Sequence, residues 1–222
     1  MPRPAALIFD FDGVLLESEF DGNRHLAELL TGLGHRHSVE DTLRNYVGLA
    51  GKDFIAAIEE RIGTELPPRF HEQLKEKSRR ALRDGIEGVV GGVDFVRSLP
   101  PDLPRAVASS SSTKWLYGHL DHLGLTDAFA PHVYSGHEHV ERGKPAPDIY
   151  MHAAEQLGVP ITDAAIIEDS PVGVRGALAS GARVIGLAAG SHCLDGHDEM
   201  LKDLGVREIA YNFDDVRRLL SL

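Results

Sequence analysis

The most constraining feature of this sequence is a short apolar run, residues 5–9, that ends in two aspartates, Asp10 and Asp12. A continuously apolar run of this length predicts a strand buried on both faces of a parallel sheet. Side chains two residues apart on an extended chain point the same way, so the two carboxylates project together. They repel each other unless a cation or a shared proton offsets their charge. The pair predicts a divalent metal site, an acid/base pair or both, and the alternative is a solvated loop capped by two aspartates.

Three later segments place further polar groups after apolar runs or in a rigid loop. One apolar run ends in four serines that begin at Ser109, and another ends in Glu168 and Asp169. Lys144 lies between a glycine and a proline, just before a predicted helix. Ligands of open α/β sheets bind at the carboxyl ends of the strands. If the strands are neighbours in one parallel sheet, the carboxylates, the hydroxyl and the lysine converge on one edge of that sheet.

The organisation of the chain changes after the first predicted strand. From about residue 18 to residue 84 the sequence carries helix signals only, and from about residue 87 strand and helix signals alternate again. Such alternation predicts a doubly wound parallel sheet with right-handed crossovers. We therefore expect an α/β core formed by residues 1–16 and 87–222, interrupted by a helical insert at residues 17–86.

The insert is expected to contain four helices. Ser18 can cap the first of them, and Ser38 with Asp41 resembles a capping box at the start of the second. Residues 52–62 predict the third helix, and a pair of prolines ending at Pro68 opens the fourth. The fourth helix is highly charged, which is typical of a solvated face.

With these segments in place, the sequence resembles the haloacid dehalogenase superfamily of phosphotransferases. The resemblance runs from about residue 5 to about residue 215. Its four motifs occur in order, as Asp10-x-Asp12-Gly13-Val14, Ser109, Gly143-Lys144-Pro145 and Glu168-Asp169-Ser170. Each motif alone is weak, whereas four in the right order and spacing are specific. The resemblance implies a Rossmann-like core beneath a small four-helix cap, with hinges near residues 16–17 and 86–88.

The resemblance and the chemistry of a phosphate monoester assign roles to the two aspartates. A phosphoryl dianion repels nucleophiles, so catalysis requires charge neutralisation and in-line placement. Asp10 is the expected nucleophile, which divides hydrolysis into two steps through an aspartyl-phosphate. Asp12 is the expected acid and base, because it is placed to protonate the leaving oxygen and then to deprotonate the attacking water. That role requires a raised pKa at Asp12.

Other residues are candidates for binding the substrate. Ser109 and the turn that follows it, including Ser110, can donate to phosphoryl oxygens, although Ser110 and the next two serines also suit capping of the next helix. Lys144 can neutralise charge on both the phosphate and the nucleophile. The glycine-containing segment 48–53 lies between the second and third helices of the insert, and Lys52 in this segment can reach the cleft. A solvated Lys52 in the first turn of the third helix is the alternative.

The carboxylates also imply a cofactor, Mg²⁺. Asp169 would supply an oxygen ligand together with Asp10 and the backbone carbonyl of Asp12, and Glu168 would bind the metal directly or through water. The segment 137–139 (His-Glu-His) also has metal-binding residue types. Its spacing matches no helical zinc motif, so we expect a surface loop there.

Composition limits the partners of the chain. The formal net charge is −11 and there is no run of Lys and Arg, so nucleic acid and anionic membranes are unlikely to be bound. Cys193 is the one cysteine, which excludes an intramolecular disulfide. The sequence shows no secretory signal and no apolar stretch near 18 residues. We expect a cytoplasmic, monomeric enzyme with no protein partner.

The sequence therefore predicts a Mg²⁺-dependent phosphatase acting on a small phosphorylated metabolite, with a sugar phosphate as the expected substrate. One alternative is a phosphomutase of the β-phosphoglucomutase type. It is disfavoured because Gly22 stands where those mutases carry a histidine. A second alternative is a catalytically silent binding protein that keeps the fold. The complete set of motif residues argues against that alternative.

Overall fold

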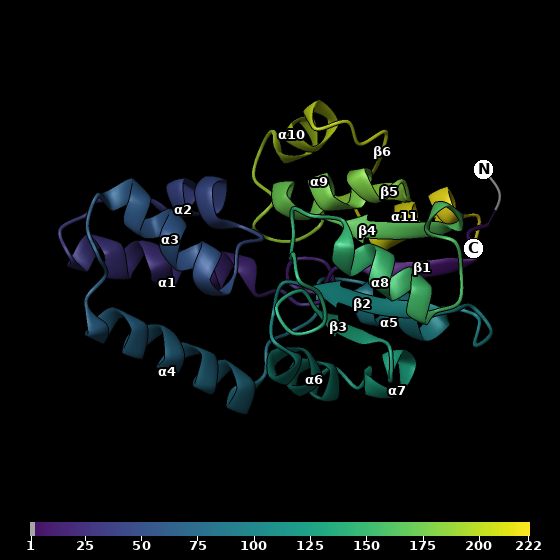
Figure 1. The fold of residues 1–222 in the computed structure, drawn as a ribbon, viewed down its shortest axis with the longest axis horizontal. Coiled ribbons are helices and arrows are strands. Elements are labelled where there is room, and N and C mark those ends of the chain that lie inside the picture. The colour runs from purple at the N-terminus through teal and green to yellow at the C-terminus, as the bar shows by residue number, and fades with distance from the viewer. Residues whose placement is uncertain (1–2) are drawn as a thin grey trace.

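A parallel sheet forms the centre of the computed structural model, which describes residues 3–222 (Figure 1). Its six strands are β1 (Ala6–Phe9), β2 (Arg105–Ser109), β3 (Val133–Ser135), β4 (Ala164–Glu168), β5 (Arg183–Leu187) and β6 (Glu208–Ala210). They lie in the order β3-β2-β1-β4-β5-β6. From β1 the chain adds β2 and β3 on one side. It then crosses to the other side of β1 and adds β4, β5 and β6. This is the doubly wound, Rossmann-like α/β fold that the sequence predicted.

Helices cover both faces of this sheet (Figure 1). One face packs against α5 (Gly92–Ser98), α6 (Thr113–His122), α7 (Thr126–Phe129) and α11 (Phe213–Leu220). The other packs against α8 (Asp148–Gln156), α9 (Pro171–Ser180) and α10 (His197–Asp203). A 3₁₀ turn, η1 (Ile161–Asp163), leads into β4.

The first strand shows why its sequence is continuously apolar. Leu7 and Phe9 enter the apolar cluster on one face of the sheet, and Ala6 and Ile8 enter the cluster on the other. All four side chains are fully buried. Burial of each large side chain contributes about 1.5–3 kcal/mol to folding. A strand covered on both faces has no position for a polar residue until it ends, which is where Asp10 follows.

Four helices connect β1 to the rest of the core and lie to one side of the sheet (Figure 1). They are α1 (Glu19–Gly32), α2 (Val39–Tyr46), α3 (Gly51–Ile62) and α4 (Pro68–Asp84). These helices, which we call the cap, have an apolar cluster of their own that includes Leu26, Leu30, Tyr46, Ile58 and Phe70. The predicted four-helix insert is therefore confirmed, while the division of the chain at residues 16–17 and 86–87 stays a prediction.

Two of the predicted helix starts differ in how they are capped. Ser38 and Asp41 form the predicted capping box of α2, in which each side chain accepts from the other residue's backbone N–H, at 3.1 and 3.0 Å. Ser18 precedes α1 as predicted, but its side chain makes no capping bond. Its hydroxyl donates instead to Asp12 Oδ1 at 2.6 Å. The predicted Ser18 cap is therefore wrong, because the Ser18 backbone has helical and not extended angles (φ −90°, ψ −24°), and its side chain turns toward Asp12.

Two short helices have no counterpart in the sequence prediction. α7 and α10 span four and seven residues, which is too short for an apolar period to become visible. α10 begins after Gly196, whose φ of +85° is accessible to glycine at little cost. This start is what places His197 near the site described below.

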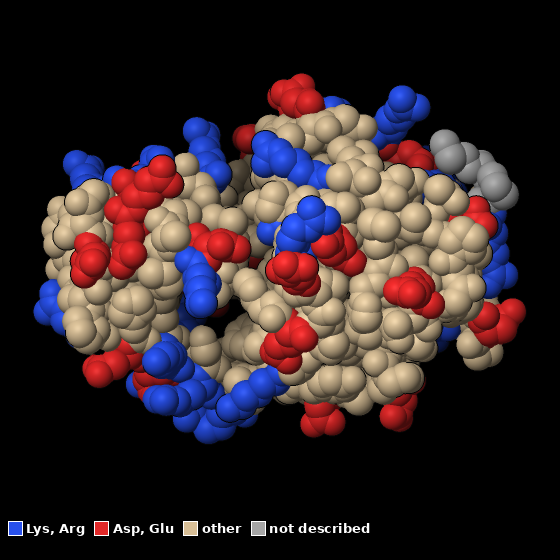
Figure 2. All heavy atoms as spheres, viewed as in Figure 1, with Lys and Arg blue, Asp and Glu red and all other residues tan. Residues whose placement is uncertain are grey.

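The face of the molecule in view mixes acidic and basic side chains and is hollowed between cap and core (Figure 2). Lys and Arg side chains gather over α4. Among residues 3–222, no helix combines the length and the apolar character that a membrane crossing requires. The cytoplasmic location and the monomeric state stay predictions.

Candidate active site

The motif residues lie at the carboxyl ends of the central strands, where the strand order reverses. β1 and β4 pair with Phe9 beside Ile167, so Asp10 follows beside Glu168. The backbone N–H of Asp10 donates to the Ile167 carbonyl at 3.0 Å. On the other side of β1, the register places Phe9 beside Val107, two residues before Ser109. The sheet therefore brings together groups that are up to 160 residues apart in the chain.

Lys144 lies between two of these carboxylates. Its Nζ donates to Asp10 Oδ1 at 2.6 Å and to Glu168 Oε1 at 2.7 Å. The ammonium also lies 4.9 Å from the centre of the Tyr150 ring. Burial alone lowers the pKa of a lysine, but Asp10 and Glu168 outweigh burial and raise the pKa of Lys144. Lys144 is therefore a fixed positive charge beside Asp10.

Glu168 is fully buried and engaged at both oxygens. Oε1 accepts from Lys144 and from the Tyr150 hydroxyl, the latter at 2.9 Å. Oε2 accepts from the backbone N–H groups of Asp169 and Ser170, both at 2.8 Å, and from the Ser170 hydroxyl at 3.1 Å. A Cβ at Gly173 would lie 1.6 Å from Oε1, so only glycine fits there. In this arrangement Glu168 orients Lys144, and its role as a metal ligand stays a prediction.

Asp169 differs from Glu168 because its carboxylate is buried without such donors. Among residues 3–222, neither Asp169 oxygen has a hydrogen-bond partner, although Oδ2 lies 2.7 Å from His192 Nε2. Carboxylate oxygens of Asp10, Glu168 and Asp169 lie within 4.8 Å of one another. Burial raises the pKa of Asp169 well above its usual range, and Glu168 adds to the rise. Burial also raises the pKa of Asp10, against the opposing charge of Lys144. A hard divalent cation would satisfy the free oxygens and offset this repulsion, so the residues fit Mg²⁺.

Asp12 is held by three donors, one of them six residues away in the chain and the other two 99 and 103 residues away. Oδ1 accepts from the Ser18 hydroxyl at 2.6 Å and from Trp115 Nε1 at 3.0 Å. Oδ2 accepts from the Ser111 hydroxyl at 2.6 Å. Of the serines expected to cap the next helix, Ser112 does so by accepting from the Trp115 N–H, whereas Ser111 binds Asp12. These donors fix the direction of the Asp12 carboxylate.

The serine segment after β2 lies next to these carboxylates. Ser109 is buried at the end of the strand, and its Oγ accepts from the Ser111 N–H at 3.0 Å. The hydroxyl hydrogen of Ser109 stays available for an anion. Ser110 is half-buried and lines a small cavity together with Lys144. Both residues therefore face the same space, as a phosphate site requires.

That cavity, of about 10 Å³, lies between core and cap. Residues of the segment 48–53 bound it on the cap side and His137 on the core side. A Cβ at Gly48 would lie 2.6 Å from Ser170 Oγ, so the segment approaches the core closely. Asp53 lines the cavity, whereas Lys52 is exposed and does not. A larger hollow of about 910 Å³ lies between α1 and α4, away from the motif residues.

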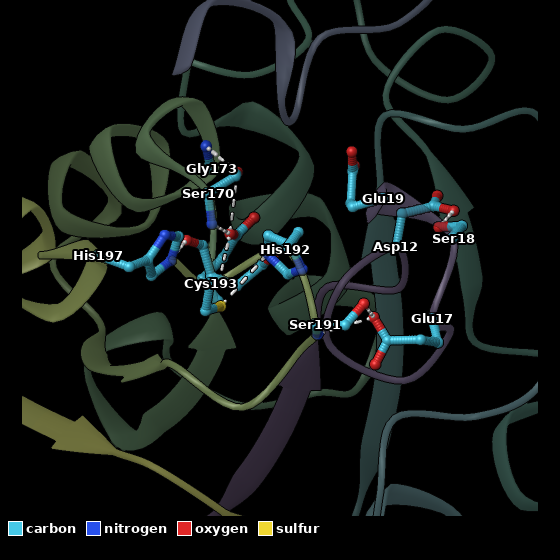
Figure 3. A network of polar contacts seen from close by, with 12 residues as sticks. Asp12, Glu17, Ser18, Glu19, Ser170, Gly173, Ser191, His192, Cys193 and His197 are labelled. Carbon is cyan, nitrogen blue, oxygen red and sulfur yellow. Dashed lines mark hydrogen bonds and ion pairs between the residues drawn. The ribbon is translucent and has the colours of Figure 1, made fainter. Parts of the chain in front are cut away.

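The sequence prediction overlooked Glu19, at the first position of α1. Figure 3 shows its side chain on the cleft side, near Asp12. Glu19 Oε2 accepts from Asn23 Nδ2 at 3.0 Å. Burial, with the negative charge of Asp12 as the next cause, raises the pKa of Glu19 to about 8. The one sequence signal was its place directly after Ser18, at the junction of core and cap.

The segment 137–139 forms a turn after β3, as expected of a loop. Glu138 instead accepts from the N–H and the hydroxyl of Thr113, at 2.9 and 2.6 Å. His139 Nδ1 accepts from the backbone N–H of Ser135 at 2.9 Å. These contacts fix the loop between β3 and Lys144.

Comparison with known proteins agrees with this geometry. The family model of haloacid dehalogenase-like hydrolases matches residues 7–187. YhcW of Bacillus subtilis is 32% identical over 220 residues, which cover 94% of this chain and 96% of that protein. Fructose-1-phosphate phosphatase YqaB of Escherichia coli is 32% identical over 81% of this chain and 94% of that protein. The haloacid dehalogenase-like protein ATU0790 of Agrobacterium tumefaciens has a solved structure with a TM-score of 0.85 and 31% identity, covering 98% of this chain and 97% of that chain.

Proposed function

The chain belongs to the haloacid dehalogenase-like hydrolase family, and on that premise we propose that it is a Mg²⁺-dependent phosphatase of a small phosphorylated metabolite. The observation that carries the proposal is the position of Lys144, at 2.6 Å from Asp10 and 2.7 Å from Glu168. A buried carboxylate held against a fixed cation, beside a second carboxylate with free oxygens, suits attack on a phosphoryl group.

Asp10 acts as the nucleophile. Its Oδ1 is bound to Lys144, which leaves Oδ2 to attack phosphorus. The bond from Asp10 to phosphorus forms as the bond to the ester oxygen breaks, and Asp12 gives a proton to that oxygen. Asp12 then takes a proton from water, which attacks the aspartyl-phosphate and releases inorganic phosphate with Asp10 restored. The three donors on Asp12 hold it in line for both transfers.

Asp10, Asp169 and the backbone carbonyl of Asp12 would hold Mg²⁺, and Glu168 would support them through Lys144. When bound, Mg²⁺ supplies positive charge that offsets repulsion between the phosphoryl dianion and Asp10. Ser109, Ser110 and Lys144 would bind the phosphoryl oxygens.

We propose a sugar phosphate as the substrate class. The relative YqaB is named as a fructose-1-phosphate phosphatase, and a Thermotoga maritima relative as a phosphorylated carbohydrates phosphatase. The polar residues Glu19, Asp53 and His137 at the cleft suit hydroxyl groups of such a substrate. Lys52 stays a candidate for the end of the substrate distant from the phosphate.

The test is release of inorganic phosphate from a panel of sugar phosphates, nucleotides and p-nitrophenyl phosphate, with Mg²⁺ and with EDTA. We expect Mg²⁺-dependent release that is fastest for a sugar phosphate, and none from the Asp10→Asn variant. Interconversion of sugar phosphate isomers on addition of a bisphosphate, with little phosphate released, would identify a mutase instead. No turnover of any monoester would contradict both functions.

A further inference from the structure

A second cluster of metal-binding side chains lies beside Asp169 and is not used by the proposed reaction. His192 and Cys193 belong to the loop after β5, and His197 opens α10. One ligand atom from each lies within 4.8 Å of the others. Figure 3 shows the three side chains turned toward one another. Two imidazoles and a thiol are ligands typical of zinc sites, whereas Mg²⁺ prefers oxygen.

The cluster is built into the interior of the molecule. His192 is 2% exposed, and Cys193 and His197 are half-buried. Two glycines leave space for the His192 ring. A Cβ at Gly190 would lie 2.5 Å from its Nδ1, and a Cβ at Gly13 would lie 2.9 Å from its Cε1. A side chain at either glycine would collide with the His192 ring, so both glycines allow this imidazole to lie next to the active-site carboxylates.

Asp169 provides a fourth potential ligand. Its Oδ2 lies 2.7 Å from His192 Nε2, but the two atoms are not aligned as a hydrogen bond, and both Asp169 oxygens are buried without such a partner among residues 3–222. His192 Nε2 also lies 3.4 Å from Cys193 Sγ. His197 Nε2 lies 2.8 Å from the Asp169 backbone oxygen. The 3.4 Å between the imidazole nitrogen and the sulfur suits two ligands of one tetrahedral cation, whereas the carboxylate oxygen and the imidazole nitrogen have to move apart when the cation binds between them.

We propose that His192, Cys193 and His197, with Asp169 as the fourth ligand, form a binding site for a soft divalent cation such as Zn²⁺. The site is distinct from the magnesium site but shares Asp169 with it. Burial raises the pKa of the Cys193 thiol, yet a coordinated thiol loses its proton to solvent and gives its lone pair to the metal. A cation bound there withdraws Asp169 from Mg²⁺ and inhibits the phosphatase. This inhibition rests on the proposed function, whereas cation binding does not.

The test uses Co²⁺ as a spectroscopic probe of the full-length protein in excess Mg²⁺. We expect a thiolate-to-cobalt charge-transfer band in the near ultraviolet that saturates at one Co²⁺ per chain and disappears on addition of Zn²⁺. Cys193→Ser removes the band and weakens Zn²⁺ binding in calorimetry at least about tenfold. His139→Gln is the control, because His139 stacks on His152 in a separate group, and it should leave the band and the affinity unchanged.

The two parts of the proposal fail in different ways. Absence of the charge-transfer band from the unaltered protein, or equal Zn²⁺ affinity with and without the Cys193 thiol, overturns the soft-metal site. The spectrum of the unaltered protein decides this even if Cys193→Ser folds poorly. A clear band in a protein that releases no phosphate would keep the site and remove the proposed function. If both stand, Zn²⁺ should inhibit the unaltered enzyme at a concentration about tenfold lower than it inhibits Cys193→Ser.

Discussion

The core and the cap hold their functional side chains in different ways. In the core, Lys144 is buried and bound to Asp10 and Glu168 at 2.6 and 2.7 Å. In the cap, Lys52 is exposed on the first turn of α3, and Asp53 reaches the shared cavity from the same turn. Two carboxylates hold Lys144 in place in the core, whereas Lys52 in the cap is exposed to solvent.

This difference follows from what each region has to recognise. The phosphoryl group is the same in every monoester, so its binding residues gain from a rigid, buried arrangement. The remainder of the substrate varies, and the cap meets the core through glycines, with Gly51 close to His137 and Gly48 close to Ser170. We therefore expect substitutions in the core to reduce kcat for all substrates. Substitutions in the cap should act on some substrates only.

The largest effect is expected for Asp10→Asn. The amide has nearly the shape of the carboxylate but is a poor nucleophile and a weaker metal ligand. We expect kcat to fall by at least about three orders of magnitude on every substrate, with an unchanged circular dichroism spectrum. Retention of more than a tenth of the activity by the purified variant would show that Asp10 is not the nucleophile.

The next effect separates proton transfer from metal binding. Asp12→Asn should lower kcat by about 10²–10⁴-fold, because it removes the acid and base but keeps the backbone carbonyl. Mg²⁺ affinity, measured by calorimetry, should change little. Ser111→Ala is a milder companion that removes one donor to Asp12 and leaves its carboxylate. If excess Mg²⁺ restored the rate of Asp12→Asn, the side chain would be a metal ligand instead.

A smaller effect is expected on metal dependence. EDTA should stop turnover and Mg²⁺ should restore it. Asp169→Ala should raise the Mg²⁺ concentration needed for half-maximal activity by at least about tenfold, because it removes a buried carboxylate that accepts no hydrogen bond from residues 3–222. Asp121→Ala, which removes an exposed carboxylate on α6, is the matched control. Full activity in excess chelator would remove the metal from the mechanism.

The sequence alone predicted those features that are set by residues close together along the chain. The strand ends at Asp10, Ser109 and Glu168 could be read because each follows an apolar run directly. The capping box of α2 could be read because its two partners are three residues apart. Local signals of this kind also placed the four cap helices. The roles of the site residues in catalysis stay predictions.

The contacts that the sequence did not reveal join distant segments. Ser111 and Trp115 reach Asp12 across 99 and 103 residues, and only the packing of α6 against the sheet brings them there. Ser18 satisfies the local rule for a helix cap, but its backbone angles are helical and its hydroxyl donates to Asp12. His192 contacts Asp169 because β5 pairs with β4 in parallel, so the segments after both strands leave the same edge of the sheet. No periodicity along the chain encodes these pairs.

The raised pKa of Glu19, at the boundary of core and cap, predicts that the stability of the protein depends on pH. Its pKa is about 8 in the folded protein and near 4.5 in the unfolded chain, so unfolding releases a proton between these values. The free energy of unfolding should therefore fall as pH rises from about 4.5 to about 8. Glu19→Gln should remove this fall and leave the variant more stable above pH 8 by about 1–3 kcal/mol, since the side chain is half-buried. Thermal melts of both proteins in EDTA, at about pH 4.5 and about pH 8, measure this change in the free energy of unfolding. The same fall with pH in Glu19→Gln as in the unaltered protein would contradict the prediction.

The smallest effect is expected in the cap, and it tests the contrast between the two regions most directly. Lys52 is exposed, so a contact that it makes with a substrate is worth about 0.5–1 kcal/mol. Lys52→Ala should raise KM about two- to fivefold for the preferred sugar phosphate. It should leave p-nitrophenyl phosphate unaffected, because that substrate offers the cap little to bind. Lys75→Ala on α4 is the control for loss of one exposed positive charge. Equal effects of Lys52→Ala on both substrates would point to long-range electrostatics, and no effect on either would assign the cap side of the cavity to Asp53 instead.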